Sequence, residues 1–419
     1  MTNEVFETDR SLRITILGIN YRPEPTGNAP YTASLAEGLV AAGHKVRVIT
    51  GYPHYPEWEL KAGYTGWIRR ETINGVEVIR LRHYIPRKPG QLNRLWMEIT
   101  FGLRLAFARW SKPDTVLVIS PALFSSALAI LRTRLRPNRP AVGIWVQDIY
   151  SRGVVEVNGK SRAGSALAAA ESYILKSADG VVAIHERFRQ YFVNSLGVSS
   201  NDVKVIRNWT HLPPSPASGS VDVRSRFGWS PDDVVVLHAG NMGQKQGLEN
   251  VLEAARLADQ SQSRVRFVLM GDGNQRRRLE ELANGIKSIE FMPPLPGDDF
   301  MDALAAADIL LVNELPGVKD MAVPSKLTSY FNAGVPVIAA TDPESVTASE
   351  IAASSGGVRV DAGDPQALLS AAESLGRDKV TAKTLGTSGL KFRNETLSET
   401  AAIGHYDDFI KSLAMSRGR

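Results

Sequence analysis

The feature that most constrains the fold is an apolar run that leads directly into a glycine turn and then a helical pattern, repeated along the chain. Val234–Ala239 leads into Gly240–Gly243, and Phe267–Met270 leads into Gly271–Gly273. A third turn, Pro324–Lys326, precedes another helical pattern. Short apolar strands that alternate with helices form parallel sheets, and their turns meet at the carboxyl edge, where phosphate groups bind. The pattern therefore predicts an open α/β sheet that binds a phosphorylated ligand.

The first half of the chain shows the same alternation. Leu12–Gly18 is predicted to be a buried strand, followed by a loop that contains Gly27 and Asn28 and by a helix over 31–42. Further short β-rich runs lie at 43–50, 76–81, 115–119, 142–146 and 180–184. Alternation of this kind implies right-handed parallel crossovers with helices on both faces. We expect the α/β class, with two Rossmann-like, doubly wound parallel-sheet domains.

The domain boundaries follow from a change in composition. The segment 211–220 is rich in Pro and Ser and lies between the two α/β patterns, so it is the predicted linker. The N-terminal domain is expected over 1–210 and the C-terminal domain over 221–395.

Composition excludes several classes of protein. With 419 residues and 43% hydrophobic residues, the chain can bury two or three domain cores. It contains no cysteine, which removes disulfides and thiolate metal sites and fits a reducing cytoplasm. No His spacing suggests a metal site, the first residues are polar, and no apolar run reaches the roughly 18 residues of a spanning helix. We expect a cytoplasmic protein that is soluble or peripheral on the membrane, with no metal.

The charge is concentrated in one region. Residues 61–140 carry 15 Lys or Arg against 4 Asp or Glu, whereas the whole chain has a net charge of +5. Aromatic and basic residues do not interleave as in a stacking platform, so no nucleic-acid partner is expected. A helix predicted over 92–110 places Arg94, Arg104 and Arg109 beside a set of apolar residues, namely Leu95, Trp96, Ile99, Leu103, Ala106, Phe107 and Trp110. Such a helix fits an anionic membrane surface, or it packs on its own domain, and the sequence leaves both open.

The order of turns resembles the nucleotide-sugar half of a GT-B glycosyltransferase, of the retaining type grouped as family four. The patterns Gly-Asn-x-Gly and Lys-Gln-Gly within Gly240–Gly247 are similar to transferases of bacterial O-antigen and colanic-acid synthesis. The resemblance implies that the two domains face a cleft and that a final helix, 399–419, packs back on the first. It also implies a nucleoside-diphosphate-sugar donor, with UDP-sugars (amino-deoxy sugars included) favoured, and a glycan or lipid-linked acceptor. No cofactor is implied.

The same resemblance assigns the site. Lys245 would stabilise the leaving diphosphate, because a cation at a helix start is disfavoured unless an anion binds there. Lys326 would lie near the phosphates, and Asp148 is the candidate acid beside the donor sugar, since Gln147 stands near the usual histidine. The nucleoside base of the donor is expected near Pro294 and Leu295. The remaining donor contacts expected are Gly27, Asn28, Gly240, Asn241, Gly243, Gly271, Asp272, Gly273, Pro324, Ser325 and Ser329.

The chain departs from the family pattern in ways that matter for the site. The arginine and lysine usual in the first turn are Asn241 and Gln246, and two usual glutamates fall on Met321 and Ser329. Ser329 would make only a weaker hydrogen bond to the ribose. Glu314 or Asp320 could replace the first carboxylate. Three residues that follow strands of the first half are further candidates, either for ligand contacts or for packing: His54, His185 and Glu186.

Two other functions compete with sugar transfer. A GT-B-fold epimerase would act on the nucleotide sugar itself, but it needs carboxylates and histidines clustered in the cleft, and these are sparse. A non-catalytic partner that binds a nucleotide sugar would fit the two missing glutamates.

Overall fold

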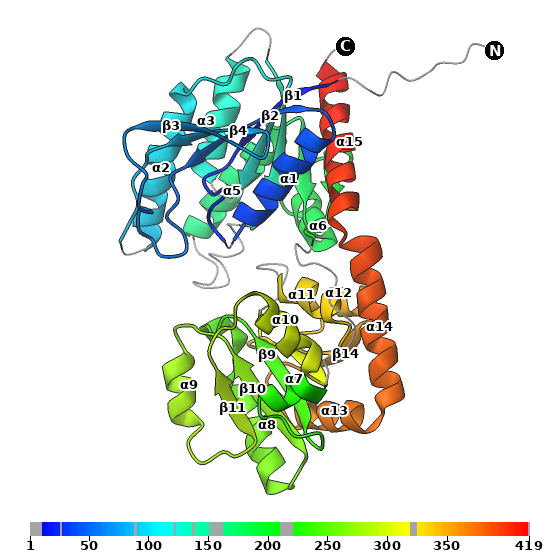
Figure 1. The fold of residues 1–419 in the computed structure, drawn as a ribbon. Helices are drawn as coiled ribbons and strands as arrows, with labels where there is room; N and C mark the ends of the chain where they lie inside the picture. The colour runs from blue at the N-terminus through cyan, green and yellow to red at the C-terminus, as the bar shows by residue number, and fades with distance from the viewer. Residues whose placement is uncertain are drawn as a thin grey trace, which may run out of the picture. The chain divides into compact units, whose positions relative to one another are not determined.

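The computed structural model describes residues 11–25, 27–87, 90–120, 123–135, 139–149, 151, 162–209, 221–318 and 325–417. The chain divides into two compact units (Figure 1). The first unit comprises Met1–Asn208 with Glu399–Arg419, and the second comprises Trp209–Ser398. Among the described residues, none of the helices is long and apolar enough to cross a membrane.

The first unit is built on a doubly wound sheet. Its described residues form eight strands in the order β3-β4-β2-β1-β5-β6-β7-β8, and of these only β3 runs antiparallel to its neighbour. The strands are β1 (Arg13–Leu17), β2 (Lys45–Gly51), β3 (Ile68–Ile73), β4 (Val76–Leu81), β5 (Thr115–Ser120), β6 (Ala141–Val146), β7 (Gly180–Ala183) and β8 (Val203–Val205). The helices are α1 (Ala29–Ala41), α2 (Gln91–Phe107), α3 (Leu123–Arg134), α5 (Arg162–Lys176), α6 (Glu186–Asn194), the 3-10 turn η1 (Ser200–Asp202) and α15 (Glu399–Arg417).

Strand β3 is an addition that the sequence analysis missed. It pairs with β4 through the turn Asn74-Gly75, whose two φ angles are +47° and +80°. Two consecutive left-handed residues form the tight turn that suits a two-residue hairpin, and Asn-Gly is the preferred pair for it. Every residue of β3 is exposed or half-buried, so the strand shows no apolar alternation. The Asn-Gly pair was the only local signal.

The second unit contains a fully parallel sheet. Within the described residues the strand order is β11-β10-β9-β12-β13-β14, so the order reverses between β9 and β12. The strands are β9 (Val234–Ala239), β10 (Val265–Met270), β11 (Ile289–Met292), β12 (Ile309–Asn313), β13 (Val337–Ala340) and β14 (Gly357–Val360). The helical segments are α7 (Val221–Arg226), η2 (Gln244–Gln246), α8 (Glu249–Gln260), α9 (Arg276–Leu282), α10 (Gly297–Ala306), α11 (Ser325–Ala333), α12 (Val346–Ser354), α13 (Pro365–Arg377) and α14 (Lys379–Thr396). Ligands bind outside the carboxyl ends of the strands at such a reversal.

Both faces of the second sheet are covered. Along β9, Val235 and Leu237 belong to one buried cluster together with Tyr330 and Phe331 of α11. The residue between them, Val236, belongs to a second cluster that includes Leu252 of α8. Alternate residues of one strand thus enter two different cores, which is why the strand is apolar throughout. The predicted α/β class with two doubly wound parallel sheets is confirmed.

The last helix, α15, completes the first unit. Phe409 and Leu413 lie over glycines of β6 and β7, where an added Cβ on Gly180 would come within 2.9 Å of both side chains. The ring of Tyr406 lies 4.9 Å from that of the buried Trp145. The glycines therefore make room for large side chains of a helix that is more than 200 residues away in sequence.

We expect Phe409→Ala to destabilise the first unit by about 3–5 kcal/mol, because it removes a buried ring and leaves a cavity over the sheet. Met415→Ala on the same helix is the matched control. Its side chain is exposed, so the change should stay within about 0.5 kcal/mol. Urea unfolding followed by circular dichroism measures both variants, and equal losses would show that α15 does not contribute a specific core contact.

Candidate functional site

Two glycine turns touch each other at the carboxyl ends of β9 and β10. The N–H of Gly240 donates to the carbonyl of Met270, and the N–H of Met242 donates to that of Asp272, both at 2.8 Å. A Cβ on Gly271 would lie 1.9 Å from the Gly240 oxygen, and one on Gly273 would lie 2.4 Å from the Met242 oxygen. Glycine is required at both positions because any side chain would force the turns apart.

The short helix η2 is fixed by groups from a distant strand. The side chain of Asn313, at the end of β12, donates to the carbonyls of Gln246 and Gly247 at 2.7 and 3.0 Å. The N–H of Gly243 donates to the side chain of Gln246 at 3.0 Å. Gln246, which replaces the lysine usual in the family, therefore holds the turn in shape. Lys245 has an exposed side chain, and its carbonyl accepts from Leu315 at 2.8 Å.

A lysine and a histidine meet beneath these turns. Lys326, on the first turn of α11, places its Nζ 2.9 Å from Nε2 of His238, a fully buried residue of β9. The same lysine lines the first glycine turn, since a Cβ on Gly240 would lie 3.1 Å from its Cε. Sequence reasoning missed His238, which lies 88 residues before Lys326. Its only signal was a polar residue inside an otherwise apolar strand.

Burial governs the protonation of this pair. It lowers the pKa of Lys326 to about 7, against the opposing effect of Glu314. Burial, and then the charge of Lys326, hold the pKa of His238 well below its usual value. The histidine is therefore neutral, and the lysine gains or loses its proton near neutral pH. Lysine with so low a pKa marks a place where a negatively charged ligand would stabilise the ammonium.

Glu314 is the first residue after β12, and its carboxylate accepts hydrogen bonds from hydroxyl groups. Thr341 and Thr347 donate to its two oxygens. Burial raises the pKa of Glu314, and the two hydroxyl donors oppose that shift. The sequence analysis offered Glu314 as a contact to the sugar, but both oxygens already accept hydrogen bonds from the protein.

The remaining candidates of the second unit have simpler surroundings. Asn241 and Asp272 are exposed, and Asp272 accepts the N–H of Gly273 at 2.7 Å. Pro294 is exposed beyond β11, whereas the half-buried Leu295 packs on the core. Ser329 is half-buried in α11, and Ser325 is the first residue of that helix. Pro324, Asp320 and Met321 lie outside the described residues.

In the first unit, two candidates lie where β1 leads into α1. Gly27 has a φ of +69°, and an added Cβ would lie 3.7 Å from the Tyr55 ring. Asn28 is the N-cap of α1 without a side-chain cap bond, and its carbonyl accepts the N–H and the hydroxyl of Thr32.

Two more candidates follow β6. Asp148 is exposed. Gln147 is buried and exchanges two hydrogen bonds with the side chain of Asn208, at 2.7 and 3.3 Å. This amide pair explains why a buried glutamine is stable there.

The histidines singled out from the sequence, His54 and His185, both contact other groups of the first unit. His185 caps α6, accepting the N–H of Arg187 at 3.2 Å, and Glu186 pairs with Arg189. His54 is buried. The backbone N–H groups of His54 and Tyr55 both donate to the carboxylate of the buried Glu24, at 2.9 Å each. Glu24 was not expected from the sequence, because nothing local distinguishes it from a loop residue.

A second buried histidine lies against His54. The two rings, of His54 and His83, meet edge to face at 5.0 Å. Burial, and then His54, lower the pKa of His83 to about 3, so this histidine is neutral. Across the described residues, no group of three or more His, Asp or Glu side chains could hold a metal ion.

Comparison with solved structures places the fold. The chain matches a sucrose-phosphate synthase from Thermosynechococcus elongatus with a TM-score of 0.73 at 18% identity, covering 97% of this chain and 100% of the other. It matches Anabaena HepE, solved in complex with UDP-glucose, with a TM-score of 0.67 at 14% identity, covering 96% and 100%. Two doubly wound sheets with glycine turns at the carboxyl ends of their strands form the GT-B fold.

Sequence comparison then identifies the family. Residues 26–209 match the family model described as a glycosyl transferase 4-like domain, and residues 233–378 match glycosyl transferases group 1. A putative colanic acid biosynthesis glycosyl transferase, WcaI of Escherichia coli K12, is 31% identical over 337 residues, which cover 77% of this chain and 82% of WcaI. The chain belongs to the GT-B glycosyltransferases of the family-four type.

The lowered pKa of the half-buried Lys326 predicts that the stability of the fold depends on pH. The ordinary pKa of lysine is 10.5, and that of Lys326 in the folded protein is about 7. Between these values the unfolded chain binds more protons than the folded one, so this group's contribution to stability rises with pH and is least favourable below pH 7. We expect Lys326→Met to gain stability relative to wild type as the pH falls from 9 to 6.

Urea unfolding at the two pH values measures this difference. Lys383→Met, at an exposed position of α14, is the matched control and should show no such change. The interpretation fails when the difference between Lys326→Met and wild type is the same at both pH values.

Proposed function

We propose that this glycosyltransferase moves a sugar, with retention of anomeric configuration, from a nucleoside diphosphate to a growing, lipid-linked glycan of the cell surface. The observation that carries the proposal is the half-buried Lys326, which lies against two glycine turns that are in contact. The likeness to WcaI, whose name refers to colanic acid, supports the acceptor class. The likeness to HepE, which was solved with UDP-glucose, supports a UDP-sugar as the donor. The proposed donors include UDP-linked amino-deoxy sugars.

The departing diphosphate gains negative charge as the glycosidic bond to it breaks, and stabilising this charge lowers the barrier. Lys245, exposed on η2, supplies one cation. Lys326 supplies a second, because a diphosphate beside it raises its pKa above 7 and favours the ammonium. Backbone N–H groups of the first turn of α11 complete the site.

These groups provide positive charge without a metal ion, so we propose metal-independent transfer. The sugar would be reached from the first unit by Asp148, while Gly27 and Asn28 would face the diphosphate. The nucleoside base of the donor would rest against Pro294 and Leu295. Ser329 would contact the ribose through a hydroxyl group in place of a carboxylate.

We expect Lys245→Ala to lower turnover about 150-fold, because the loss of this contact raises the barrier by on the order of 3 kcal/mol. Its effect on nucleoside binding should be smaller. The assay screens UDP- and GDP-sugars with a lipid-linked acceptor and measures transferred sugar, with and without EDTA. Lys383→Ala, an exposed lysine of α14, is the control and should keep wild-type turnover.

The competing functions give different products in this assay. An epimerase would convert the donor without an acceptor, and a non-catalytic partner would bind the donor without any turnover. Unchanged turnover in Lys245→Ala would remove the role given to this lysine. Strong inhibition by EDTA would require a metal.

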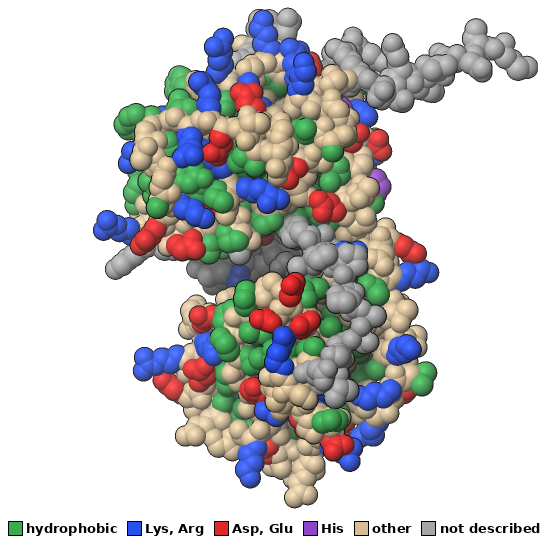
Figure 2. Space-filling view, viewed as in Figure 1, with side chains coloured by type: hydrophobic (Ala, Val, Ile, Leu, Met, Phe, Trp, Pro, Cys, Tyr) green, Lys and Arg blue, Asp and Glu red, His purple; other side chains and the backbone are tan. Residues whose placement is uncertain are grey.

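The acceptor would be reached from a membrane surface, for which helix α2 provides a face. Its exposed apolar side chains, here called the α2 face, are Leu95, Trp96, Leu103 and Phe107, whose exposed fractions run from 46% to 88%. In Figure 2, hydrophobic side chains gather at the left edge of this unit, over α2 and β3, with Lys and Arg among them. The opposite side of the helix packs inward through Met97, Phe101 and Leu105. Trp110, expected at the headgroup level, is instead buried beyond the end of α2.

Arginines surround this apolar face. Arg104 lies 4.9 Å over the exposed ring of Trp67, and Arg94 lies 5.0 Å over Trp58. An exposed apolar face with arginines at its edge complements an anionic bilayer, and each arginine near the surface contributes about 1 kcal/mol. We therefore propose a peripheral protein on the cytoplasmic face of an anionic membrane.

We expect wild-type protein to sediment with vesicles of phosphatidylcholine and phosphatidylglycerol at low salt and to be released at high salt. Trp96→Ser with Phe107→Ser should reduce the bound fraction at least tenfold, because it removes the apolar contact but no charge. Tyr173→Ser on α5, equally exposed, is the control. Sedimentation that persists in the double variant would mean that the α2 face does not touch lipid.

A further inference from the structure

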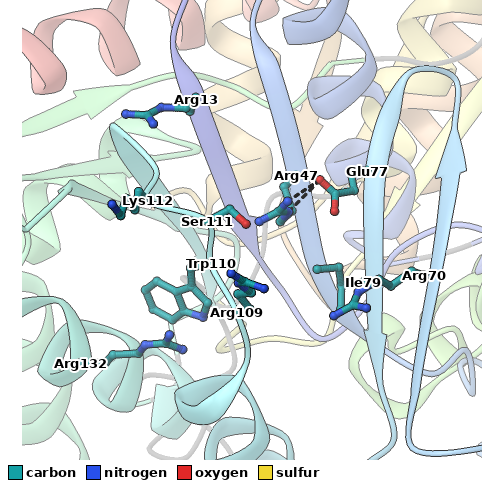
Figure 3. Close-up of a pocket in the computed structure, with 10 residues that line it drawn as sticks. All are labelled: Arg13, Arg47, Arg70, Glu77, Ile79, Arg109, Trp110, Ser111, Lys112 and Arg132. Atoms are coloured by element: carbon teal, nitrogen blue, oxygen red, sulfur yellow. Dashed lines mark hydrogen bonds and ion pairs between the residues drawn. The ribbon is translucent and has the colours of Figure 1, made fainter.

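A second cationic site lies in the first unit, whereas the glycine turns belong to the second unit. It is a pocket of about 650 Å³ near the amino ends of β1, β2 and β5 (Figure 3). Gly27 and Asn28 lie beyond the opposite, carboxyl end of β1. Six cationic side chains line the pocket, namely Arg13, Arg47, Arg70, Arg109, Lys112 and Arg132, and the one acidic lining residue is Glu77. Neither the fold nor the donor site requires such a collection of like charges.

Part of this charge is neutralised within the protein. Arg47 pairs with Glu77, the ion pair drawn in Figure 3, and Arg13 pairs with Asp114 at 2.8 Å. Glu77 uses a single oxygen, Oε2, for both of its bonds from Arg47.

The other cations retain a surplus. Within the described part of the chain, Arg70, Arg109 and Lys112 make no ion pair. Six cations against the two carboxylates Glu77 and Asp114 leave a local charge of about +4. The positive charges that line this pocket repel one another, so a bound anion would stabilise the arrangement.

Hydrogen bonds and a cation–ring contact link the residues at the base of the pocket. The indole N–H of the buried Trp110 and a guanidinium N–H of Arg132 both donate to the carbonyl of Leu105, at 3.1 and 2.9 Å. Arg132 lies 4.2 Å from the centre of the Trp110 ring. The next two residues, Ser111 and Lys112, are both left-handed, with φ of +49° and +52°. Both side chains are exposed, and this backbone conformation is uncommon for residues other than glycine.

We propose that this pocket binds a phosphate-bearing anion, either a phosphomonoester or a diphosphate. Guanidinium groups match the oxygens of phosphate with two parallel hydrogen bonds, and the volume lies within the range of small-ligand pockets. The anion has two possible sources. One is a free phosphate compound, and the other is a lipid headgroup, because Arg109 follows the exposed Phe107 by two residues and Arg70 follows the exposed Trp67 and Ile68.

The test is a calorimetric titration of the full chain with pyrophosphate at low ionic strength. The triple variant Arg70→Gln, Arg109→Gln, Lys112→Gln should weaken binding at least tenfold while keeping its ion pairs and fold. A charge-matched control, Arg277→Gln, Arg377→Gln, Lys383→Gln, loses three exposed cations of the second unit and should bind as wild type does. Lys326→Met should also retain this binding event, which separates the pocket from the donor site.

The same proteins are then sedimented with phosphatidylcholine vesicles that contain phosphatidic acid, which exposes a phosphomonoester. A tenfold loss in the pocket variant but not in the control identifies a lipid headgroup as the source. Wild-type sedimentation of the pocket variant, together with its loss of pyrophosphate binding, identifies a free phosphate compound. The proposal is overturned when wild-type protein binds neither probe, when the pocket variant binds both probes as wild type does, or when the control variant loses as much affinity as the pocket variant.

Discussion

The donor side of this protein depends on the contact between two backbone turns. Gly271 and Gly273 bring the turn after β10 against the turn after β9, so closely that a Cβ on Gly271 would overlap the carbonyl of Gly240. The contact is closed by hydrogen bonds between the two turns, and it leaves Gly240 beside Lys326. Asn313 fixes η2 from the neighbouring strand.

Burial gives the site its electrostatic character. Lys326 is held beside the neutral His238, with Glu314 as its opposing charge and two threonines orienting that carboxylate. Keeping a lysine in such a place lowers the stability of the ligand-free fold, and a bound diphosphate would recover the lost stability. Proteins retain such unfavourable groups mainly where they act on a ligand. In the proposed function, the lysines would supply the charge stabilisation of the diphosphate.

The first unit separates its surfaces by chemistry. One side of α2 is apolar and exposed with arginines at its edge, and the segment after it leads into the cationic pocket around Arg47 and Arg109. The carboxyl edge of the same sheet carries Gly27, Asn28 and Asp148. The apolar α2 face and the carboxyl edge of this sheet therefore belong to different elements of the unit.

The sequence by itself determined the α/β class, the glycine turns and Lys245 and Lys326 as candidates, because strand, turn and helix signals depend on neighbours within a few residues. The comparisons confirmed the family that those turns resembled. Tertiary structure alone decided that Lys326 meets His238, that Gln246 holds its own turn, and that Trp110 is buried while Phe107 is exposed. It also revealed β3, whose strand lacks apolar alternation. Such features join residues far apart in sequence, and they exist only once packed elements exclude water and bring those side chains together.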